Sequence, residues 1–422
     1  MTKRILVFFP QNPYPPQSGA HYRVLEVLAG LKQLGCHITL LSSTYTSPTK
    51  WTGKSIAALK EQWVHSVFIY AATRWDYRFT RRAESYYRWT RTRPSIDSFL
   101  QSPPGMRWWF RRLAHRVRPD VVLMNYAYWD GLLHYAWPSK ATRIIDTLDL
   151  VSLNRAMQAA ITPYVSEGYI DPAAINDEVV EDGFFDRLGL SVDPKEFKVF
   201  DHYDYTIAIT QQEAEIIKRG TRRSTVVTLP MTFRPAYVTN SYAGGPLFTT
   251  GPNLFNVQGY LYFVKRVLPY VLREEPSFLL QVMGMWPPGI SVAAAAGIVL
   301  RGFVPDLSVE YATASFSVCP VFAGTGQQIK IVEAMAHGLP VVALSPAAAR
   351  SPIRNGVNGL IVSNAADFGA QVVRLWRDRD LCQRLGQAAR ETIAQEFSTK
   401  QLTAQLSMLI GERAPSNRTQ RS

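Results

Sequence analysis

Short apolar runs alternate with segments of helical periodicity along the whole chain. In the first half, the runs that we predict to be strands are Ile5–Phe9, His37–Leu41, Val64–Ile69, Val121–Asn125, Arg143–Thr147, Tyr205–Thr210 and Val226–Leu229. In the second half they are Leu247–Thr250, Phe278–Met283, Gly297–Arg301, Phe316–Val321, Pro340–Leu344 and Gly359–Val362. Helical patterns such as Tyr22–Leu34 and Val257–Arg273 lie between most of them. This alternation predicts an α/β fold of parallel sheets covered by helices.

The length of the chain, 422 residues, suggests two domains at roughly 100–200 residues each. Residues 230–245 are rich in Pro, Gly, Asn and Tyr and predict the linker. We therefore expect a Rossmann-like N-terminal domain over 1–235 and a second Rossmann-like domain over 236–396. Residues 397–422 should form a helix that packs back toward the first domain, followed by a flexible tail. Ligands of such sheets bind at the carboxyl ends of strands, so the site should lie on loops that face a central cleft.

Composition narrows the class of protein and its partners. Apolar residues make up 47% of the chain, which is typical of a globular protein with a sizeable core. The formal net charge of +13 favours anionic partners. The three cysteines, Cys36, Cys319 and Cys382, are too widely spaced to indicate a disulfide framework or a zinc site. The sequence shows no signal peptide and no apolar run of about 18 residues, so we expect a cytoplasmic protein.

The stretch from Gly324 to Leu344 carries the most specific chemistry. A glycine turn, Gly324-Thr-Gly326, follows a predicted strand and opens a predicted helix. Glycines let the backbone approach a ligand closely, and free N–H groups at a helix N-terminus favour phosphate. Lys330 and Glu333 are three residues apart and share one helix face. They suit a diphosphate and a ribose, respectively; the alternative is a solvated ion pair.

This stretch resembles the donor-binding signature of glycosyltransferase family 4, the group 1 transferases with the GT-B fold. The shared pattern is a glycine turn followed by Lys-x-x-Glu-Ala-Met-Ala-x-Gly-x-Pro-Val-Val. Three other segments resemble family motifs and occur in family order, namely Asn12–Gly19 with Arg23, Gly302–Leu307 and Gly356–Val362. The resemblance implies a retaining glycosyltransferase with a nucleoside diphosphate sugar as donor and no further cofactor. No Asp-x-Asp follows a predicted strand in a metal-binding context, so we expect transfer that is metal-independent. The acceptor would be a glycan, a lipid-linked molecule or a small molecule.

The resemblance also assigns roles to individual residues. It places the donor on the second domain and the acceptor on the first. The residues expected at the donor are Ser18, Gly19, Gly251, Asn253, Asn256, Phe303, Thr325, Gly326, Gln327, Gln328, Lys330 and Glu333. The expected catalytic residues are Lys330, Asp146 and Asp149. The residues expected to contact the acceptor are Arg23 and Tyr126. For Asn256 the alternative is an N-cap, and for the two aspartates it is an N-cap or a turn.

The sequence departs from the family pattern at two positions. The family commonly has a glutamate where this chain has Thr325, and often a histidine where it has Leu148. Both changes bear on the sugar rather than on the nucleotide. They favour one alternative to glycosyl transfer, a non-catalytic sugar-nucleotide-binding protein. A second alternative, a nucleotide-sugar epimerase, stays open because it can share the fold.

Residues 74–118 contain 12 arginines, no lysine and only three acids, Asp76, Glu84 and Asp97. The aromatic residues among them are Trp75, Tyr77, Phe79, Tyr86, Tyr87, Trp89, Trp108, Trp109 and Phe110. The segment suits peripheral contact with the inner face of a membrane or an anionic acceptor. Nucleic acid is the least favoured partner. The remaining alternative is that the segment forms helices that cover the first sheet and has solvated arginines.

Overall fold

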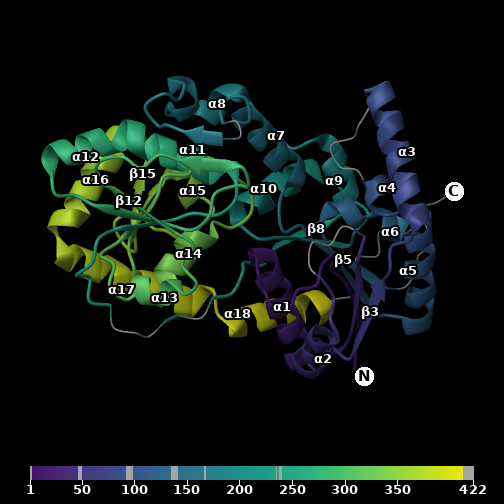
Figure 1. Cartoon of the computed structure of the whole chain (residues 1–422). Helices are drawn as coiled ribbons and strands as arrows, with labels where there is room; N and C mark the ends of the chain where they lie inside the picture. Colours follow the sequence, from purple (N-terminus) through teal and green to yellow (C-terminus); the bar gives the residue numbers. More distant parts are fainter. Residues whose placement is uncertain are drawn as a thin grey trace. The chain divides into compact units, whose positions relative to one another are not determined.

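The computed structural model describes residues 2–45, 50–91, 98–134, 141–165, 168–233, 235–236 and 240–411. The chain forms two compact units (Figure 1). The first contains Met1–Ser152, Val192–Thr232 and Thr399–Ser422, and the second contains Leu153–Ser191 and Phe233–Ser398. Residues 153–191, which we placed in the first domain, thus group with the second unit. The predicted flexible tail from residue 412 lies outside the described residues.

The first unit contains a seven-stranded parallel sheet with the order β3-β2-β1-β4-β5-β7-β8. Its strands are β1 (Arg4–Phe8), β2 (His37–Ser43), β3 (Ser66–Tyr70), β4 (Val121–Asn125), β5 (Thr142–Asp146), β7 (Tyr205–Ala208) and β8 (Thr225–Thr228). Its helices are α1 (Gly19–Gln33), α2 (Gly53–Gln62), α3 (Arg74–Thr90), α4 (Ser98–Gln101), α5 (Pro104–Val117), α6 (Gly131–His134), α9 (Pro194–Phe200), α10 (Gln211–Gly220) and α18 (Thr399–Gly411), with a 3-10 turn η1 (Ala127–Trp129). The strand order reverses between β1 and β4, where parallel sheets bind ligands.

The second unit contains a six-stranded parallel sheet with the order β12-β10-β9-β13-β14-β15. Its strands are β9 (Leu247–Thr249), β10 (Leu280–Met283), β12 (Ile298–Gly302), β13 (Ser317–Cys319), β14 (Val341–Leu344) and β15 (Leu360–Val362). The helices are α8 (Phe184–Leu188), α11 (Leu254–Tyr262), α12 (Leu268–Glu274), α13 (Leu307–Tyr311), α14 (Ile329–Ala336), α15 (Ser345–Ala348), α16 (Ala365–Arg377) and α17 (Arg379–Glu396), with a 3-10 turn η2 (Asp177–Val180). Helix α7 (Val151–Ile161) begins in the first unit and continues in the second. Here the order reverses between β9 and β13.

The predicted α/β class is confirmed, and each of the thirteen predicted strands forms within two residues of its expected bounds. A further parallel pair, β6 (Gly168–Ile170) with β11 (Ile290–Val292), was not predicted. Each of these strands has three residues, which is too short to show a period. The predicted helix over 257–273 begins earlier, at Leu254, and contains a π-helical turn, η3 (Phe263–Val267). Pro269 follows this turn and has no N–H to continue the α-helical bonds.

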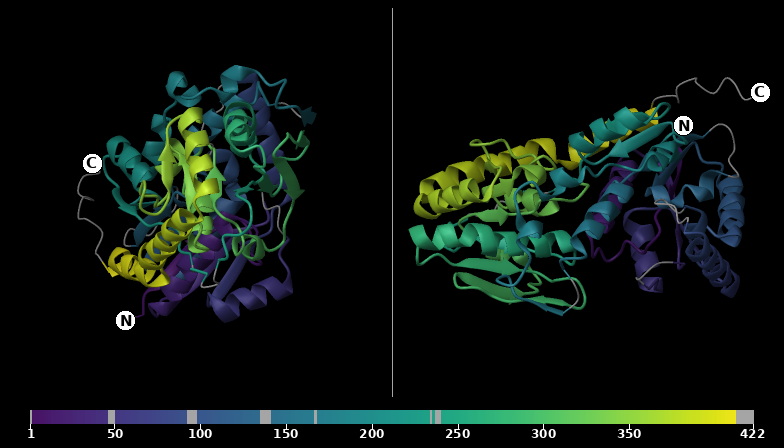
Figure 2. Two further views of the ribbon diagram at one scale, coloured as in Figure 1. Left: turned by 90° about the vertical axis from the view of Figure 1, so that its left-hand side faces the viewer. Right: turned by 90° about the horizontal axis from the view of Figure 1, so that it is seen from above.

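The C-terminal helix α18 packs against α1 within the first unit (Figure 2). The two helices meet at Gly30, where an added Cβ would lie 2.9 Å from Leu406. Lys3 donates a hydrogen bond to the carbonyl of Ile410 near the end of α18. Among the described helices, none has both the length and the apolar character needed to span a bilayer.

Candidate donor site

The loop that follows β9 folds around two asparagines. Asn253 is the N-cap of α11, and its side chain accepts a hydrogen bond from the backbone N–H of Asn256 at 3.0 Å. The N-cap is therefore Asn253, not Asn256 as the alternative reading had it. The Asn256 amide instead points back into the loop and donates to the carbonyl of Gly251 at 2.8 Å. The Asn256 side-chain oxygen accepts a hydrogen bond from Lys330 of α14.

Lys330, on α14 after β13, meets this loop. Its ammonium donates to Oδ1 of Asn256 and lies 6.0 Å from the centre of the Phe248 ring. An added Cβ at Gly251 would lie 3.9 Å from Nζ of Lys330. Burial lowers the pKa of Lys330 to about 7, although Cys319 and Glu333 oppose the shift. Lys330 is therefore not a solvated partner of Glu333; it is a largely buried amine with a pKa of about 7 at the reversal point of the sheet.

The glycine turn after β13 is built around a buried arginine. Gly324 and Gly326 have φ angles of 127° and 73°, which favour glycine. The Arg350 guanidinium donates to the carbonyls of Ala323 at 2.9 Å and Thr325 at 3.4 Å. It lies against Gly324, where an added Cβ would be 2.8 Å from Nη1. Sequence reasoning missed Arg350; the signal was a single cation ending the apolar stretch that follows β14.

Replacing Arg350 by methionine should lower the free energy of unfolding by about 1–3 kcal/mol, because buried carbonyls lose their donor. Urea unfolding measures this. Arg354→Met is the matched control, since Arg354 makes an exposed ion pair with Glu396, and such pairs contribute about 1 kcal/mol or less. Equal losses in the two variants would show that Arg350 does not hold the turn.

Helix α14 begins directly after this turn. Its N-cap, Gln328, makes no side-chain capping bond, so the N–H groups of the first turn are oriented toward the loop. Gln327 is buried, and Gly326 completes the turn. Thr325 accepts a hydrogen bond from the Asn154 amide at 3.1 Å. The residue that replaces the family's first glutamate is thus bonded to α7, an element that the sequence did not connect with this loop.

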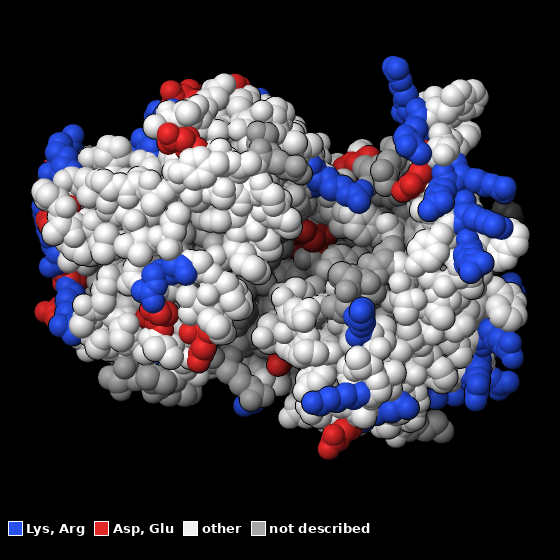
Figure 3. Space-filling view, viewed as in Figure 1, with Lys and Arg blue, Asp and Glu red and all other residues white. Residues whose placement is uncertain are grey.

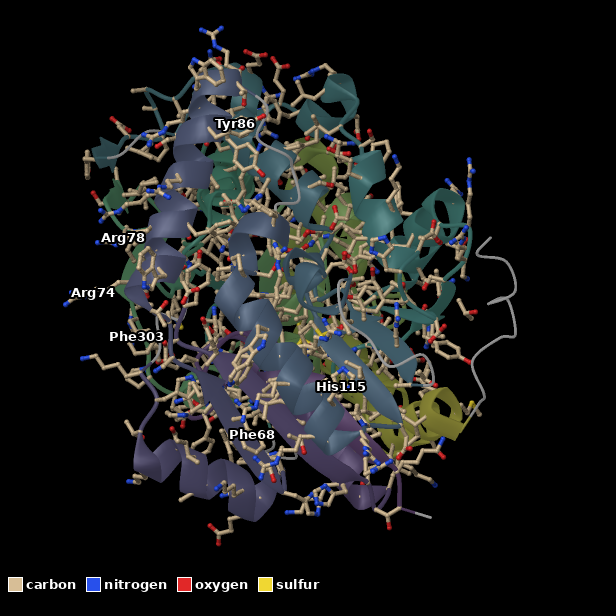
Figure 4. All side chains as sticks on the ribbon, turned by 90° about the vertical axis from the view of Figure 1, so that its right-hand side faces the viewer. Phe68, Arg74, Arg78, Tyr86, His115 and Phe303 are labelled. Carbon is tan, nitrogen blue, oxygen red and sulfur yellow. The ribbon has the colours of Figure 1, made fainter. Side chains whose placement is uncertain are left out.

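Glu333 lies one turn further along α14. The hydroxyl of Tyr311 donates to Oε2 of Glu333 at 3.4 Å, and the Tyr311 ring stacks on His337 with centroids 4.7 Å apart. Burial raises the pKa of the Glu333 carboxyl. Phe303 lies on the loop after the edge strand β12, and its ring is 65% exposed (Figure 4). The structure thus brings Gly251, Asn256 and Lys330 together, whereas Phe303 extends into solvent.

Two expected residues of the first unit have another role. Nε of Arg23 lies 2.9 Å from Oδ2 of Asp146, and both side chains are only 1% exposed. Arg23 also donates to the carbonyl of Pro230 at 2.7 Å. The pair ties α1 to the end of β5. We therefore correct the expectations of an acceptor contact at Arg23 and a catalytic carboxylate at Asp146, because neither side chain reaches the surface.

The remaining candidates of the first unit lie at the carboxyl ends of strands. Ser18 caps α1 by accepting the N–H of His21 at 3.4 Å, and Gly19 is the first residue of that helix. Tyr126 and Leu148 follow the neighbouring strands β4 and β5 with φ angles of 65° and 57°. Such angles are unusual in bulky residues and concentrate at functional sites. Burial, and the carboxylate of Asp149, raise the pKa of Tyr126, so these two side chains are neighbours.

No group of three or more His, Cys, Asp or Glu side chains that would hold a metal ion occurs within the described ranges. The candidate site is instead made of one cation, backbone N–H groups, amides and one carboxylate. Its chemistry suits an anion next to a hydroxyl-bearing group.

Comparisons with known proteins give a family match within the second unit. The family model "Glycosyl transferases group 1" matches residues 247–378, which include both loops of the site. A curated relative, "Putative glycosyltransferase EpsD" of Bacillus subtilis (strain 168), is 29% identical over 103 residues. That match covers 24% of this chain and 27% of the length of EpsD.

Solved structures match over nearly the whole chain. Anabaena Alr3699/HepE in complex with UDP-glucose has a TM-score of 0.61 at 12% identity, covering 97% of this chain and 99% of that one. An S. aureus TarM mutant in complex with Fondaparinux, alpha-GlcNAc-glycerol and UDP has a TM-score of 0.61 at 9% identity, covering 97% and 100%. The sucrose-phosphate synthase from Thermosynechococcus elongatus has a TM-score of 0.59 at 13% identity, covering 96% and 98%. At these identities the likeness shows the fold. Residues 247–378 thus match the model of the group 1 glycosyltransferases, and the chain has the GT-B fold of these solved structures.

Proposed function

We propose that this protein transfers a sugar from a nucleoside diphosphate sugar to an acceptor. The observation that carries the proposal is the convergence of Lys330, Asn256 and Gly251 where the sheet order of the second unit reverses. A desolvated ammonium beside an uncapped helix N-terminus suits a diphosphate. The structural neighbours HepE and TarM were solved with UDP or UDP-glucose, so UDP is the first ligand to test.

The proposed reaction breaks the bond between the anomeric carbon and the diphosphate oxygen. The electron pair leaves with the diphosphate, the acceptor oxygen bonds to the anomeric carbon, and the acceptor proton passes to a base or to the leaving group. Negative charge therefore builds on the diphosphate in the transition state. Lys330 and the N-terminus of α14 would stabilise this charge. Glu333 would accept hydrogen bonds from the ribose hydroxyls.

The stereochemical outcome and the metal requirement are further parts of the proposal. The family resemblance supports attack on the face from which the diphosphate departs, which retains the anomeric configuration. Lys330 supplies positive charge at the diphosphate, which supports transfer without a divalent metal. The anomeric configuration of the product, determined by NMR, tests the first point. A rate that EDTA abolishes and Mg²⁺ restores would contradict the second.

A thermal-shift screen over sugar nucleotides, followed by product analysis, tests the activity itself. A donor that binds folded protein raises the melting temperature by mass action. Transfer requires an acceptor, whereas an epimerase would convert the sugar nucleotide alone, and NMR of the incubated donor separates the two. A non-catalytic binder, which Thr325 and Leu148 keep open, would shift the melting temperature without turnover. Absence of any shift would overturn the proposal.

We further propose an anionic or lipid-linked acceptor and a peripheral location on the inner face of a membrane. The net charge of +13 supports an anionic acceptor. The TarM neighbour was solved with Fondaparinux and with alpha-GlcNAc-glycerol, which shows that this fold accommodates glycan-like ligands in that protein. Transfer assays with neutral and phosphorylated acceptors of the same sugar would rank the two classes.

The affinity for UDP should fall as pH rises above 7. The pKa of Lys330 is about 7 without ligand, and a bound diphosphate would raise it because it stabilises the ammonium. Below pH 7 the lysine is already charged, whereas above it binding must take up a proton. From pH 7 to 8.5 the affinity should drop roughly tenfold. The secondary pKa of a phosphate is near 6, so the charge of UDP changes little in this window.

Isothermal titration calorimetry in buffers of different ionisation enthalpy measures both the affinity and the proton uptake. Lys330→Met should bind more weakly and show an affinity that is flat from pH 7 to 8.5. Equal pH dependence in the variant and the wild type would assign the titration to another group.

A further inference from the structure

Exposed aromatic side chains concentrate on one part of the first unit. Six of the fifteen exposed large apolar side chains among the described residues lie between positions 75 and 108, namely Trp75, Tyr77, Tyr86, Trp89, Phe99 and Trp108. Trp89 is 82% exposed and Trp75 is 72% exposed. Exposed clusters of this kind mark surfaces that bind something. We call the outer faces of α3 and α5 the arginine–aromatic surface.

The first turn of helix α3 is anchored to the unit by Asp76. The carboxylate of Asp76 accepts hydrogen bonds from the Thr73 backbone at 2.7 Å and from the Tyr70 hydroxyl at 2.9 Å. Gly105 of α5 approaches the same carboxylate, so the two helices start close together. From residue 81 to residue 90, however, α3 has no buried residue. The side chains of this stretch are exposed or half-buried, and Tyr86 and Trp89 are among the exposed ones. Figure 1 shows the course of α3.

The aromatic residues of α3 form a stripe. Trp75, Phe79, Tyr86 and Trp89 are spaced by 4, 7 and 3 residues, which places them on one side of the helix. Arginines adjoin this stripe and the corresponding rings of α5. The guanidinium of Arg78 lies 5.0 Å from the ring centre of Trp75. On α5, Arg112 lies 5.5 Å from the ring centre of Trp108.

The charge of the surface is predominantly positive. The arginines of α3 and α5 are Arg74, Arg78, Arg81, Arg82, Arg88, Arg107, Arg111, Arg112 and Arg116, and Arg91 and Arg118 follow at the helix ends. The acids are Asp76, which is buried, and Glu84. Figure 3 shows basic side chains gathered along this edge of the first unit, and Figure 4 shows Arg74, Arg78 and Tyr86 on α3 and His115 on α5.

We propose that the arginine–aromatic surface docks the protein on an anionic lipid bilayer. Tryptophan and tyrosine favour the headgroup level of a membrane, and exposed arginines bind lipid phosphates in a bidentate manner. The exposed rings of Trp75, Tyr86 and Trp89 gain an apolar environment when α3 lies in the interface. A bilayer fits better than nucleic acid, because one face of Trp75 and one of Trp108 already carry an arginine, which limits base stacking.

Vesicle flotation tests the docking surface and does not depend on glycosyl transfer. Full-length protein should float with vesicles of phosphatidylcholine and phosphatidylglycerol at low salt. It should not float with phosphatidylcholine alone, and high salt should release it. The double variant Arg78→Glu/Arg82→Glu, and separately Trp89→Ser, should each bind the anionic vesicles at least about tenfold more weakly. Because these side chains are exposed or partly exposed, circular dichroism and the melting temperature should stay unchanged.

The matched control is Arg222→Glu/Arg223→Glu, which makes the same charge change at exposed arginines elsewhere on the first unit. It should float like the wild type. Equal binding by the α3 variants and this control would overturn the proposal. So would equal flotation of the wild type with neutral vesicles. A gel shift with single-stranded DNA that the α3 variants abolish, without vesicle binding by the wild type, would assign the surface to nucleic acid.

Discussion

Lys330→Met should lower kcat/KM about 10- to 100-fold with the preferred sugar nucleotide, because a charge-assisted bond contributes roughly 1.5–3 kcal/mol. The loss should be larger if the bond strengthens as charge moves onto the diphosphate. The structural reason is the position of the ammonium, which is held by Asn256 beside Gly251. Steady-state kinetics measures the effect, and calorimetry with UDP separates ground-state binding from the transition state.

The stability of this variant distinguishes a catalytic role from a structural one. Burial lowers the pKa of Lys330, so the folded protein holds an ammonium that would be better solvated in the unfolded chain. Methionine removes the cost of burying this ammonium. The melting temperature of Lys330→Met should therefore equal or exceed that of the wild type near pH 7 and below, where the lysine of the wild type is charged. The matched control is Lys265→Met, since Lys265 pairs with Asp177 at 2.9 Å. It should keep its rate. An unchanged rate in Lys330→Met would rule out the proposed role.

Glu333→Ala should weaken UDP binding about 10- to 100-fold, because one carboxylate is proposed to accept hydrogen bonds from both ribose hydroxyls. The wild type should therefore prefer UDP to its 2′-deoxy analogue, and the variant should lose this preference. Calorimetry with the two nucleotides on the two proteins forms a double-mutant cycle. If the variant discriminates between the nucleotides as the wild type does, Glu333 does not contact the ribose.

Tyr311→Phe is the control for this cycle. The Tyr311 hydroxyl donates to Glu333 at 3.4 Å, a long bond that orients the carboxylate without supplying its charge. Its removal should cost only a few-fold in affinity, by an order-of-magnitude estimate, and leave the preference for the 2′-hydroxyl in place. Tyr311 also stacks on His337, and phenylalanine keeps that contact.

The fold was largely predictable because its strands are buried. Central parallel strands such as β1 read as continuous apolar runs, which a sequence shows directly. The strands β6 and β11 were missed because each has only three residues, too few to show a period. Their pairing, Gly168 opposite Ile290, spans 122 positions and has no local signal. The packing of residues 153–191 in the second unit was also not predicted. The local sequence of a surface segment does not indicate which of the two sheets the segment will pack against.

By itself the sequence determined the elements of the site whose geometry is local. Short-range backbone geometry places Lys330 and Glu333 on one face of a helix, because they are three residues apart. It also explains the glycines at 324 and 326, which adopt positive φ angles. Only the tertiary structure decided the partners. Asn256 meets Lys330 across 74 positions, and Arg23 meets Asp146 across 123. Arg350 supports the glycine turn from the turn that follows α15. The physical reason is that hydrogen bonds between distant residues depend on the order of the strands in a sheet. The local conformational propensity of a segment does not determine that order.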